Sequence, residues 1–250
     1  MQDTYSEIIL NEEIGHSYWR IRFKTGWKDY VPGQFVMIEI LGKGAFLRRP
    51  FSIARLNRGV IEVCYKVVGQ GTLSMSVLKA GTKAWVLGPL GNGFTLPKSR
   101  QEILLVAGGY GIAPLVGLAE KLKGNNVHLL YGTKTSKDLL YINELKKLGV
   151  KLHITTEDGS KGEKGLVTNS FKAFLTHQRT NAQIFACGPH GMLSAIQKLL
   201  THQIHCQLSL ESYMACGIGA CIGCVVKDNR GNYIRVCKEG PVFDASGVEL

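Results

Sequence analysis

The sequence predicts an α/β protein with an added all-β domain. We expect an N-terminal antiparallel barrel, a central doubly wound parallel sheet and a small C-terminal metal-binding module. The first part of the chain has short runs of alternating polar and apolar residues, the middle has apolar runs between helical patterns, and the end has four closely spaced cysteines. A chain of 250 residues has room for two ordinary domains and a small appendage. We expect these domains at residues 1–99, 100–210 and 211–250.

The N-terminal domain is predicted to be a barrel because short strands recur with turn residues between them. The expected strands cover residues 18–23, 34–40, 51–55, 60–66 and 83–87. The turn residues are Pro32, Gly33, Gly42, Asn57, Gly59 and Gly81. One helix should interrupt the strands, with Thr72 as its N-terminal cap, Leu73, Val77 and Leu78 on its apolar face, and Gly81 at its end.

The central domain is predicted to contain a parallel sheet because strands alternate with helical segments. Residues 102–107 form a continuous apolar run, as expected for a strand that is buried on both faces. The later strands are expected at 127–131, 151–155, 183–187 and 206–210, and the last of them would complete the sheet. The helices are expected at 115–122, 136–148, 168–175 and 190–200.

Two motifs in the barrel have the chemistry to bind a phosphate-bearing ligand. The segment 48–52 (R-R-P-F-S) places a guanidinium, an aromatic ring and a hydroxyl at the start of a strand, and arginine binds phosphate through its fork of donors. The segment 69–72 (G-Q-G-T) is a glycine-rich turn before a helix, where backbone N–H groups favour a pyrophosphate. Each motif alone also fits an ordinary strand edge or turn. Their combination, followed by G-P-L-G at 88–91, is more specific.

Two motifs in the central domain have the pattern of a dinucleotide site. The segment 108–114 (G-G-Y-G-I-A-P) follows the first strand at its carboxyl end, where open α/β sheets bind ligands. Its glycines let a dinucleotide approach the backbone, and Pro114 fits the first turn of the helix that follows. The segment 186–192 (A-C-G-P-H-G-M) follows a later strand. Cys187 within it could equally be a small buried apolar residue.

Four cysteines near the end of the chain form a candidate metal site. Cys216, Cys221, Cys224 and Cys237 have the spacing C-x4-C-x2-C-x12-C, with small residues between them. Four thiolates hold an iron–sulfur cluster, and an x4 then x2 start is the plant-type spacing. Zinc sites usually pair thiols in two short knuckles, and structural thiols or disulfides are a third alternative. We favour a [2Fe–2S] cluster, with a hairpin of residues 225–227 and 233–236 that returns Cys237 to Cys224.

Composition and charge make nucleic-acid binding and membrane insertion less favoured functions. The net charge is +11, yet the 30 lysines and arginines are scattered and form no basic stripe with interleaved aromatic residues. A zinc-stabilised nucleic-acid-binding module is therefore a remote alternative, and we expect no nucleic-acid partner. No apolar run reaches the roughly 20 residues that span a bilayer, so we expect no membrane span. Seven cysteines without a signal-peptide pattern suggest a reduced, cytoplasmic protein.

The motifs together carry a family resemblance. R-P-F-S, G-Q-G-T, G-G-Y-G-I-A-P and C-G-P-x-x-M resemble the flavin and pyridine-nucleotide domains of the ferredoxin-reductase superfamily. With the four-cysteine tail, the whole chain resembles the electron-transfer subunits of type B dihydroorotate dehydrogenase, the PyrK family. The resemblance implies FAD, NAD(H) and a [2Fe–2S] cluster as cofactors. The family often has tyrosine where this chain has Phe51, so the ring is kept and a hydroxyl contact to the flavin is lost.

The resemblance also implies a set of binding residues. FAD would be bound by Arg49, Pro50, Phe51, Ser52, Cys64, Tyr65, Lys66, Gly71 and Thr72. NAD(H) would be bound at its pyrophosphate by Gly108, Gly109, Gly111 and Pro114, and near its nicotinamide by Cys187, Gly188 and Pro189. The cluster would be bound by Cys216, Cys221, Cys224 and Cys237. Lys134 could meet a 2′-phosphate, but no arginine pair accompanies it, so we favour NADH over NADPH. We expect no dedicated catalytic acid or base, because hydride transfer to a flavin needs none.

The function implied by the resemblance is electron transfer. Electrons from NADH would pass through FAD and the cluster to an FMN-containing dihydroorotate dehydrogenase subunit, which forms orotate in pyrimidine biosynthesis. The chain would not act on dihydroorotate alone, and the expected assembly is a heterotetramer with two of each chain. An NAD(P)H reductase subunit of a ferredoxin-, sulfide- or hydrogenase-linked complex is the alternative. The internal motifs do not separate these two functions, whereas the partner chain would.

Overall fold

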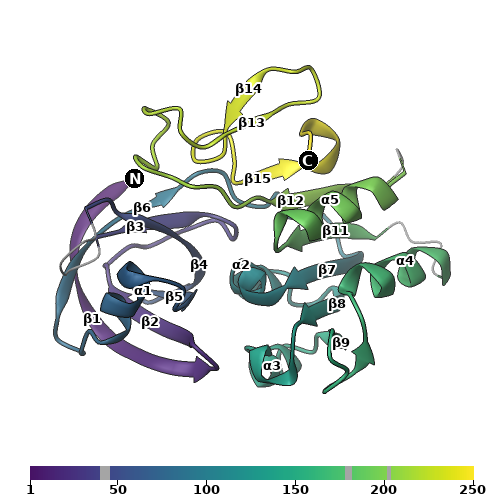
Figure 1. Ribbon diagram of the computed structural model, residues 1–250, viewed down its shortest axis with the longest axis horizontal. Coiled ribbons are helices and arrows are strands. Elements are labelled where there is room, and N and C mark those ends of the chain that lie inside the picture. The colour runs from purple at the N-terminus through teal and green to yellow at the C-terminus, as the bar shows by residue number, and fades with distance from the viewer. Residues whose placement is uncertain (40–45, 178–181, 202–203) are drawn as a thin grey trace.

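The computed structural model describes residues 1–39, 46–177, 182–201 and 204–250 and has three parts (Figure 1). A closed barrel lies beside a seven-stranded sheet, and the C-terminal segment lies across one end of both. The predicted fold class is thus confirmed: an antiparallel barrel, a parallel-sheet domain and a small C-terminal module.

The barrel closes in the strand order β1-β2-β5-β4-β3-β6. Its strands are β1 (Gln2–Gly15), β2 (Tyr18–Lys24), β3 (Phe35–Ile38), β4 (Arg49–Asn57), β5 (Val60–Lys66) and β6 (Lys83–Leu90). Strand β1 was not among the expected strands, because its sequence is mostly polar and only Ser6 and Ile8 are buried. Backbone pairing with β2 and β6 defines it instead. Ile40 and Gly42, expected as a strand end and a turn, lie outside the described residues.

The helix of the barrel, α1 (Gln70–Ser76), differs from the expected one in its N-cap, in its apolar face and in its end, which lies at Ser76 and not at Gly81. Gly69 is its N-cap, and Thr72 lies at the third helical position, where its hydroxyl accepts hydrogen bonds from the N–H groups of Val68 and Gly69. Of the expected apolar face, Leu73 and Val77 are exposed, whereas Leu78, beyond the end of the helix, is partly buried against the barrel core. Met75 is fully buried in the barrel core instead.

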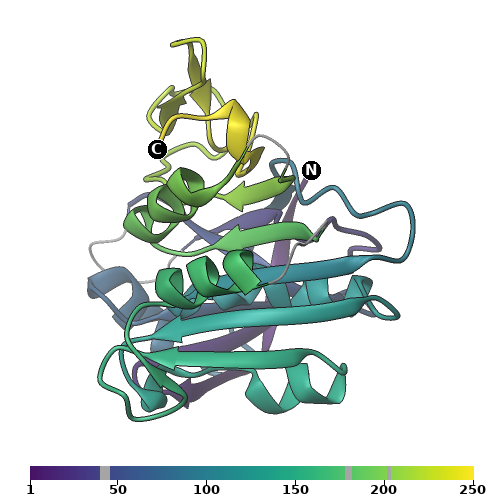
Figure 2. The ribbon, with the colours of Figure 1, turned by 90° about the vertical axis from the view of Figure 1, so that its right-hand side faces the viewer.

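The second part is a mainly parallel sheet in the order β10-β9-β8-β7-β11-β12-β15. Its parallel strands are β7 (Glu102–Gly108), β8 (Asn126–Thr133), β9 (Lys151–Thr156), β10 (Glu163–Lys164), β11 (Gln183–Cys187) and β12 (Cys206–Ser209). Its helices are α2 (Ile112–Lys121), α3 (Ile142–Lys147), α4 (Val167–His177) and α5 (His190–Leu199). Helices α2 and α3 pack on one face, and α4 and α5 cover the other, which faces the viewer in Figure 2. The apolar run of β7 is therefore buried on both sides, as expected.

The helix expected at 136–148 is interrupted. Thr135 is the N-cap of the 3-10 helix η2 (Ser136–Asp138), and its N–H and hydroxyl both donate to the Asp138 carboxylate. Tyr141 then adopts a left-handed conformation with φ of 58° before α3 begins, and its buried ring lies 5.4 Å from the Arg55 guanidinium carbon. Tertiary packing against the barrel thus overrides the helical pattern of the sequence.

The C-terminal segment is tied to the sheet. Strands β13 (Val225–Lys227) and β14 (Tyr233–Arg235) form the predicted hairpin. Strand β15 (Val242–Asp244) then pairs antiparallel with β12, so the expectation that the strand at 206–210 completes the sheet was wrong. A sequence pattern cannot reveal this pairing, because it joins strands on either side of the cysteine segment.

The three parts share apolar cores. Gly117 of α2 lies so close to the barrel that a Cβ there would be 2.0 Å from Tyr30 Oη and 2.5 Å from the Ala54 carbonyl oxygen. Met37 and Leu90 of the barrel belong to the same apolar cluster as Val236 of the tail. No helix among the described residues is long and apolar enough to cross a bilayer.

Candidate functional site

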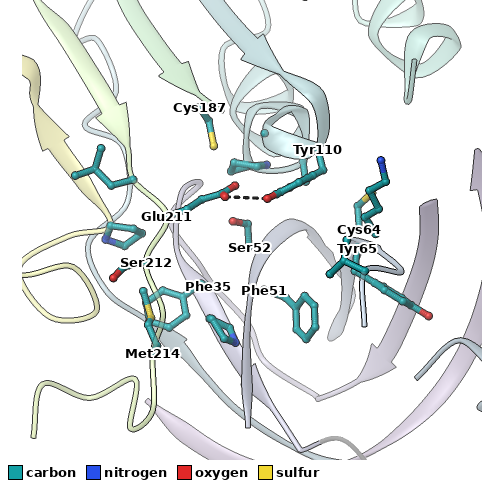
Figure 3. Close-up of a pocket in the computed structure, with 18 of the residues that line it drawn as sticks. Phe35, Phe51, Ser52, Cys64, Tyr65, Tyr110, Cys187, Glu211, Ser212 and Met214 are labelled. Atoms are coloured by element: carbon teal, nitrogen blue, oxygen red, sulfur yellow. Dashed lines mark hydrogen bonds between the residues drawn. The ribbon is translucent and has the colours of Figure 1, made fainter. Parts of the chain in front are cut away.

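A cavity of about 240 Å³ lies where the barrel, the sheet and the tail meet (Figure 3). The barrel contributes Phe35, Pro50, Phe51, Ser52, Cys64, Tyr65, Lys66, Val68 and Thr72 to its wall. The sheet domain contributes Tyr110, Gly111, Ala113, Pro114 and Cys187, and the tail contributes Leu210, Glu211, Ser212, Met214 and Pro241. We call this space the central cavity.

Most of the residues expected to bind FAD line the central cavity. Pro50, Phe51 and Ser52 reach it from β4, and Cys64, Tyr65 and Lys66 reach it from β5. Thr72 reaches it from α1. Arg49 and Gly71, both within the described residues, are not part of its wall; the Arg49 guanidinium donates through Nη1 to the Leu47 carbonyl. Their phosphate-binding roles stay predictions.

Aromatic rings and neutral groups dominate the barrel side of the central cavity. The rings of Phe51 and Tyr65 meet edge to face with centroids 6.0 Å apart, and Tyr65 Oη donates to Asn11 Oδ1 at 3.1 Å. Burial raises the pKa of the Cys64 thiol to about 12 and also raises the pKa of Cys187, so both are neutral thiols at pH 7. Such a wall suits a planar, largely apolar ring system with a few polar edge atoms.

A second cavity, of about 500 Å³, lies at the carboxyl ends of the parallel strands. It is lined by Tyr18, Lys66, Gly108, Gly109, Tyr110, Gly132, Thr133, Lys134, Asp138, Glu157, Gly165, Leu166, Val167, Thr168, Pro189, Gly191, Met192 and Ala195. This is the edge where open α/β sheets bind ligands. We call it the nucleotide cavity.

The residues expected to bind NAD(H) divide between the two cavities. Gly108, Gly109 and Pro189 line the nucleotide cavity. Gly111, Pro114 and Cys187 line the central cavity. Gly188, which the structure describes, lines neither, and the Met192 methyl group would lie 2.5 Å from a Cβ placed there. Because Lys66 and Tyr110 line both cavities, the two spaces adjoin.

The sequence reasoning missed several residues of the central cavity. Glu211, Ser212 and Met214 follow β12, at the same carboxyl edge as the nucleotide motifs. Tyr110 lies within the predicted motif itself, and its hydroxyl donates to Glu211 Oε2 at 2.9 Å. Although Glu211 keeps an exposed surface, desolvation by the surrounding protein raises the pKa of its carboxyl. A carboxylate directly after a strand of a parallel sheet was the signal that could have identified Glu211.

The four cysteines are arranged in two pairs. The Cys221 N–H donates to the Cys216 sulfur at 3.4 Å, and the Cys237 N–H donates to the Cys224 sulfur at 3.4 Å. The hairpin therefore brings Cys237 beside Cys224, as predicted. Among the described residues, no group of three or more histidine, cysteine or acidic side chains is gathered to hold one metal ion. Two pairs of thiols match the donor set of a two-iron cluster.

Backbone N–H groups also point at the sulfurs. Ile218 donates to the Cys216 sulfur at 3.5 Å, and Gly219 donates to the Cys237 sulfur at 3.1 Å. Desolvation raises the pKa of Cys216, but hydrogen bonds from the backbone outweigh it and lower the pKa to about 6. For Cys237, burial and the neighbouring Cys224 raise the pKa to about 12. Hydrogen bonds to sulfur stabilise thiolate and sulfide charge, so this loop fits an iron–sulfur cluster.

Comparison with protein families gives two matches that follow the chain in order. The iron–sulfur cluster binding domain of dihydroorotate dehydrogenase B matches residues 211–249. The NAD-binding domain of oxidoreductases matches residues 105–198.

Individual relatives match over nearly the full length. The chain is 38% identical to the electron transfer subunit of dihydroorotate dehydrogenase B (NAD(+)) from Caldanaerobacter subterraneus subsp. tengcongensis, over 97% of both chains. The corresponding subunit from Clostridium acetobutylicum is 36% identical, over 99% of this chain and 97% of that one. A solved structure of an NADH-dependent reduced ferredoxin-NADP oxidoreductase superposes with a TM-score of 0.88 at 31% identity, covering 98% of this chain and 90% of the other.

Proposed function

The chain belongs to the family of dihydroorotate dehydrogenase B electron transfer subunits, and from this premise we propose that it passes electrons from NADH through FAD and a [2Fe–2S] cluster to a dihydroorotate dehydrogenase catalytic subunit. One observation carries the proposal. The central cavity is lined jointly by the barrel, by the nucleotide motifs and by the segment that leads to Cys216. Residues expected to bind the flavin and the nucleotide therefore share one wall with the segment that precedes the four cysteines.

The chain's own residues would position the cofactors. When bound, FAD accepts a hydride from NADH and releases its electrons singly, which matches a one-electron iron–sulfur acceptor. Phe51 and Tyr65 offer apolar ring contacts, and the Ser52 hydroxyl can hydrogen-bond a polar edge of the flavin. Cys216, Cys221, Cys224 and Cys237 would ligate the cluster as thiolates. The proposal assigns no side chain as a catalytic acid or base.

The path from the central cavity to the cluster loop is short. Phe35 of β3 lines the cavity, and Met37 of the same strand packs against the loop. A Cβ on Gly217 would lie 2.5 Å from Met37 Cγ, so the loop rests directly on the barrel. We infer that electrons leave the flavin toward the tail through this packed contact.

We also propose NADH as the donor in preference to NADPH. Lys134, which could meet a 2′-phosphate, lines the nucleotide cavity, but Asp138 and Glu157 line it as well. Two carboxylates oppose the added charge of a 2′-phosphate and can accept hydrogen bonds from a ribose hydroxyl. The relatives from Caldanaerobacter subterraneus and Clostridium acetobutylicum are NAD(+) enzymes by name, which supports this choice.

The proposed partner is the FMN-containing catalytic subunit, in an assembly of two of each chain. Exposed apolar side chains surround the cluster loop: Tyr213 is 97% exposed, Ile222 63% and Ile218 46%. Such residues beside a redox centre suit a partner surface. All seven cysteines are free thiols, which supports a reducing compartment, the cytoplasm. This chain would not oxidise dihydroorotate without the partner.

A second candidate function keeps the chemistry and changes the partner. The similarity to the NADH-dependent ferredoxin-NADP oxidoreductase chain favours a reductase subunit of such a complex. The chain that co-purifies with this protein would distinguish the two. A dihydroorotate dehydrogenase catalytic subunit would support the first function, and a ferredoxin- or NADP-linked subunit would support the second.

The experiment that tests the proposal is a spectrum combined with one substitution. The purified protein should show visible flavin bands on a broad iron–sulfur absorption. Cys221→Ser should abolish the iron–sulfur absorption and transfer to the partner, whereas NADH should still reduce the flavin. Cys206→Ala, which changes a cysteine outside the set of four, serves as the matched control. A colourless protein with bound zinc would contradict the proposal, and so would a Cys221→Ser variant that retains FAD but loses flavin reduction.

A further inference from the structure

Tyr110 lies at the junction of the central cavity and the nucleotide cavity and lines both. Its hydroxyl donates to Glu211 Oε2 at 2.9 Å, although the two residues are 101 positions apart in the chain. In Figure 3 this hydrogen bond is drawn between Cys187 on one side and Ser52 on the other, all in the wall of the central cavity. We call the Tyr110–Glu211 contact the bridge.

The order of the strands explains where the bridge lies. Tyr110 follows β7, Glu211 follows β12, and β11 lies between these two strands in the sheet. Cys187 is the last residue of β11. The bridge therefore crosses the carboxyl end of β11, a span of roughly two strand spacings, or about 10 Å.

This position conflicts with direct hydride transfer. The reacting atoms must approach to about 3–3.5 Å, so the nicotinamide and flavin rings need van der Waals contact. The predicted nicotinamide residue Cys187 and the predicted flavin residue Ser52 lie on opposite sides of the bridge. A nicotinamide ring that reached from Cys187 to a flavin beside Ser52 would need the space that the bridge crosses.

From this conflict we propose that Tyr110 is a gate between the two cavities, which the bridge to Glu211 holds closed and which must swing aside when the nicotinamide enters. The inference rests on the proposed function, since it takes NADH as the ligand of the nucleotide cavity. It assigns to Tyr110 and Glu211 control of access to the flavin. The adenosine and pyrophosphate parts of the nucleotide bind in the nucleotide cavity and do not enter the central cavity, so the gate does not restrict them.

The surroundings of Tyr110 allow the side chain to move while the turn stays in place. Tyr110 is 41% exposed, so it can leave the bridge without unfolding the core. Gly111, the next residue, is held tightly: a Cβ there would lie 2.3 Å from the Cys187 carbonyl oxygen. Gly109, on the other side, has φ of 54° and no atom within 4 Å of an added Cβ. Opening is therefore a rotation of the side chain and requires no shift of the loop.

A closed gate lowers the apparent affinity for the nicotinamide end in proportion to the open fraction. A hydrogen bond contributes about 1 kcal/mol net, which corresponds to about a 5-fold change in affinity. Removing the Tyr110 hydroxyl should shift the gate toward the open state by about 1 kcal/mol. The affinity for a complete dinucleotide should therefore rise about 5-fold.

The test uses the FAD-loaded protein and two probes that do not react. One probe is 1,4,5,6-tetrahydro-NAD, which has the nicotinamide-side ring but cannot donate a hydride, and the other is ADP-ribose, which lacks that ring. Dissociation constants are measured by calorimetry.

Tyr110→Phe and Glu211→Leu should each strengthen tetrahydro-NAD binding about 5-fold, and the double variant should show no further gain. ADP-ribose binding should not change, and Tyr213→Phe, on a fully exposed tyrosine, is the matched control.

The outcomes separate the gate from the proposed function. If the unaltered protein binds neither probe, the proposed function fails and the gate with it. If the unaltered protein binds tetrahydro-NAD but Tyr110→Phe leaves that affinity unchanged or weakens it, only the gate is overturned. Equal gains for both probes would overturn it too, because a gate acts on the nicotinamide end alone.

Discussion

At the scale of single residues, Gly111 allows the two nucleotide motifs to come into contact. The turn after β7 and the end of β11 come so close at Gly111 that a Cβ there would lie 2.3 Å from the Cys187 carbonyl oxygen and 2.8 Å from the Gly188 Cα. Both neighbours are backbone atoms, which cannot rotate away. The motif G-x-G predicts close approach of a ligand, and the structure adds close approach of another strand as a second reason for the glycine.

Gly111→Ala should therefore destabilise the protein even without nucleotide. Overpacking of this kind costs about 1–3 kcal/mol, and each kcal/mol lowers the melting temperature of a chain of this size by about 2–4 °C. Thermal unfolding of the FAD-loaded protein measures the effect. Gly191→Ala in α5 is the matched control, because nothing lies within 4 Å of its added Cβ. Equal melting temperatures for the two variants would refute the argument.

At the scale of elements, the hairpin holds the cluster loop in place through Arg235 of β14. One Arg235 Nη1–H donates to the Gly219 carbonyl at 3.1 Å, and Nε donates to Glu239 Oε2 at 3.0 Å. Glu239 also accepts from the Arg235 backbone N–H at 2.7 Å. One side chain thus ties the loop that contains three of the thiols to the turn that follows the fourth.

Arg235→Ala should release this loop and make the cluster labile. Loss of partners around metal ligands weakens metal binding by about 10–100-fold, so we expect the cluster to be removed by a chelator at least about 10-fold faster. The decay of iron–sulfur absorbance over time measures this rate. Arg230→Ala, in the hairpin turn, is the control and should lose its cluster at the original rate. Unchanged kinetics in Arg235→Ala would show that the backbone alone holds the loop.

At the scale of the whole molecule, the tail is integrated with both domains. Its strand β15 extends the sheet beyond β12, and Val236 shares an apolar cluster with Met37 of the barrel. Arg55 of β4 reaches Glu120 of α2 at 2.7 Å, which fixes the barrel against the sheet domain. The central cavity therefore has walls from all three parts. The outer surface of the cluster loop, with Ile222 at 63% exposure, is exposed and can meet a partner.

Ile222→Asp should weaken association with the catalytic subunit while flavin reduction by NADH stays normal. A buried apolar anchor at an interface contributes about 2 kcal/mol or more, which corresponds to a loss of affinity on the order of 30-fold. Association is measured by analytical ultracentrifugation of the mixed subunits. Val77→Asp places the same charge at a 70% exposed site on α1 and should leave association intact. If both variants assemble normally, the cluster loop is not the docking surface.

The sequence by itself determined those features of the fold and the site that depend only on residues close together in the chain. The apolar run of β7, the turn at 108–114, the hairpin and the cysteine spacing follow from covalent reach and from strand or helix periodicity, which act over a few residues. Both nucleotide motifs and the flavin strands could be recognised in this way. Their order along the chain also identified the family.

Only the tertiary structure decided which distant segments meet. Met75 rather than Leu73 is buried because the barrel lies on that side of α1. Tyr141 breaks the expected helix because it packs against Arg55, and β15 joins β12 across the cysteine segment. The Tyr110–Glu211 bridge spans 101 residues. No local period encodes such contacts, since they depend on how the separate apolar faces of the chain pack together.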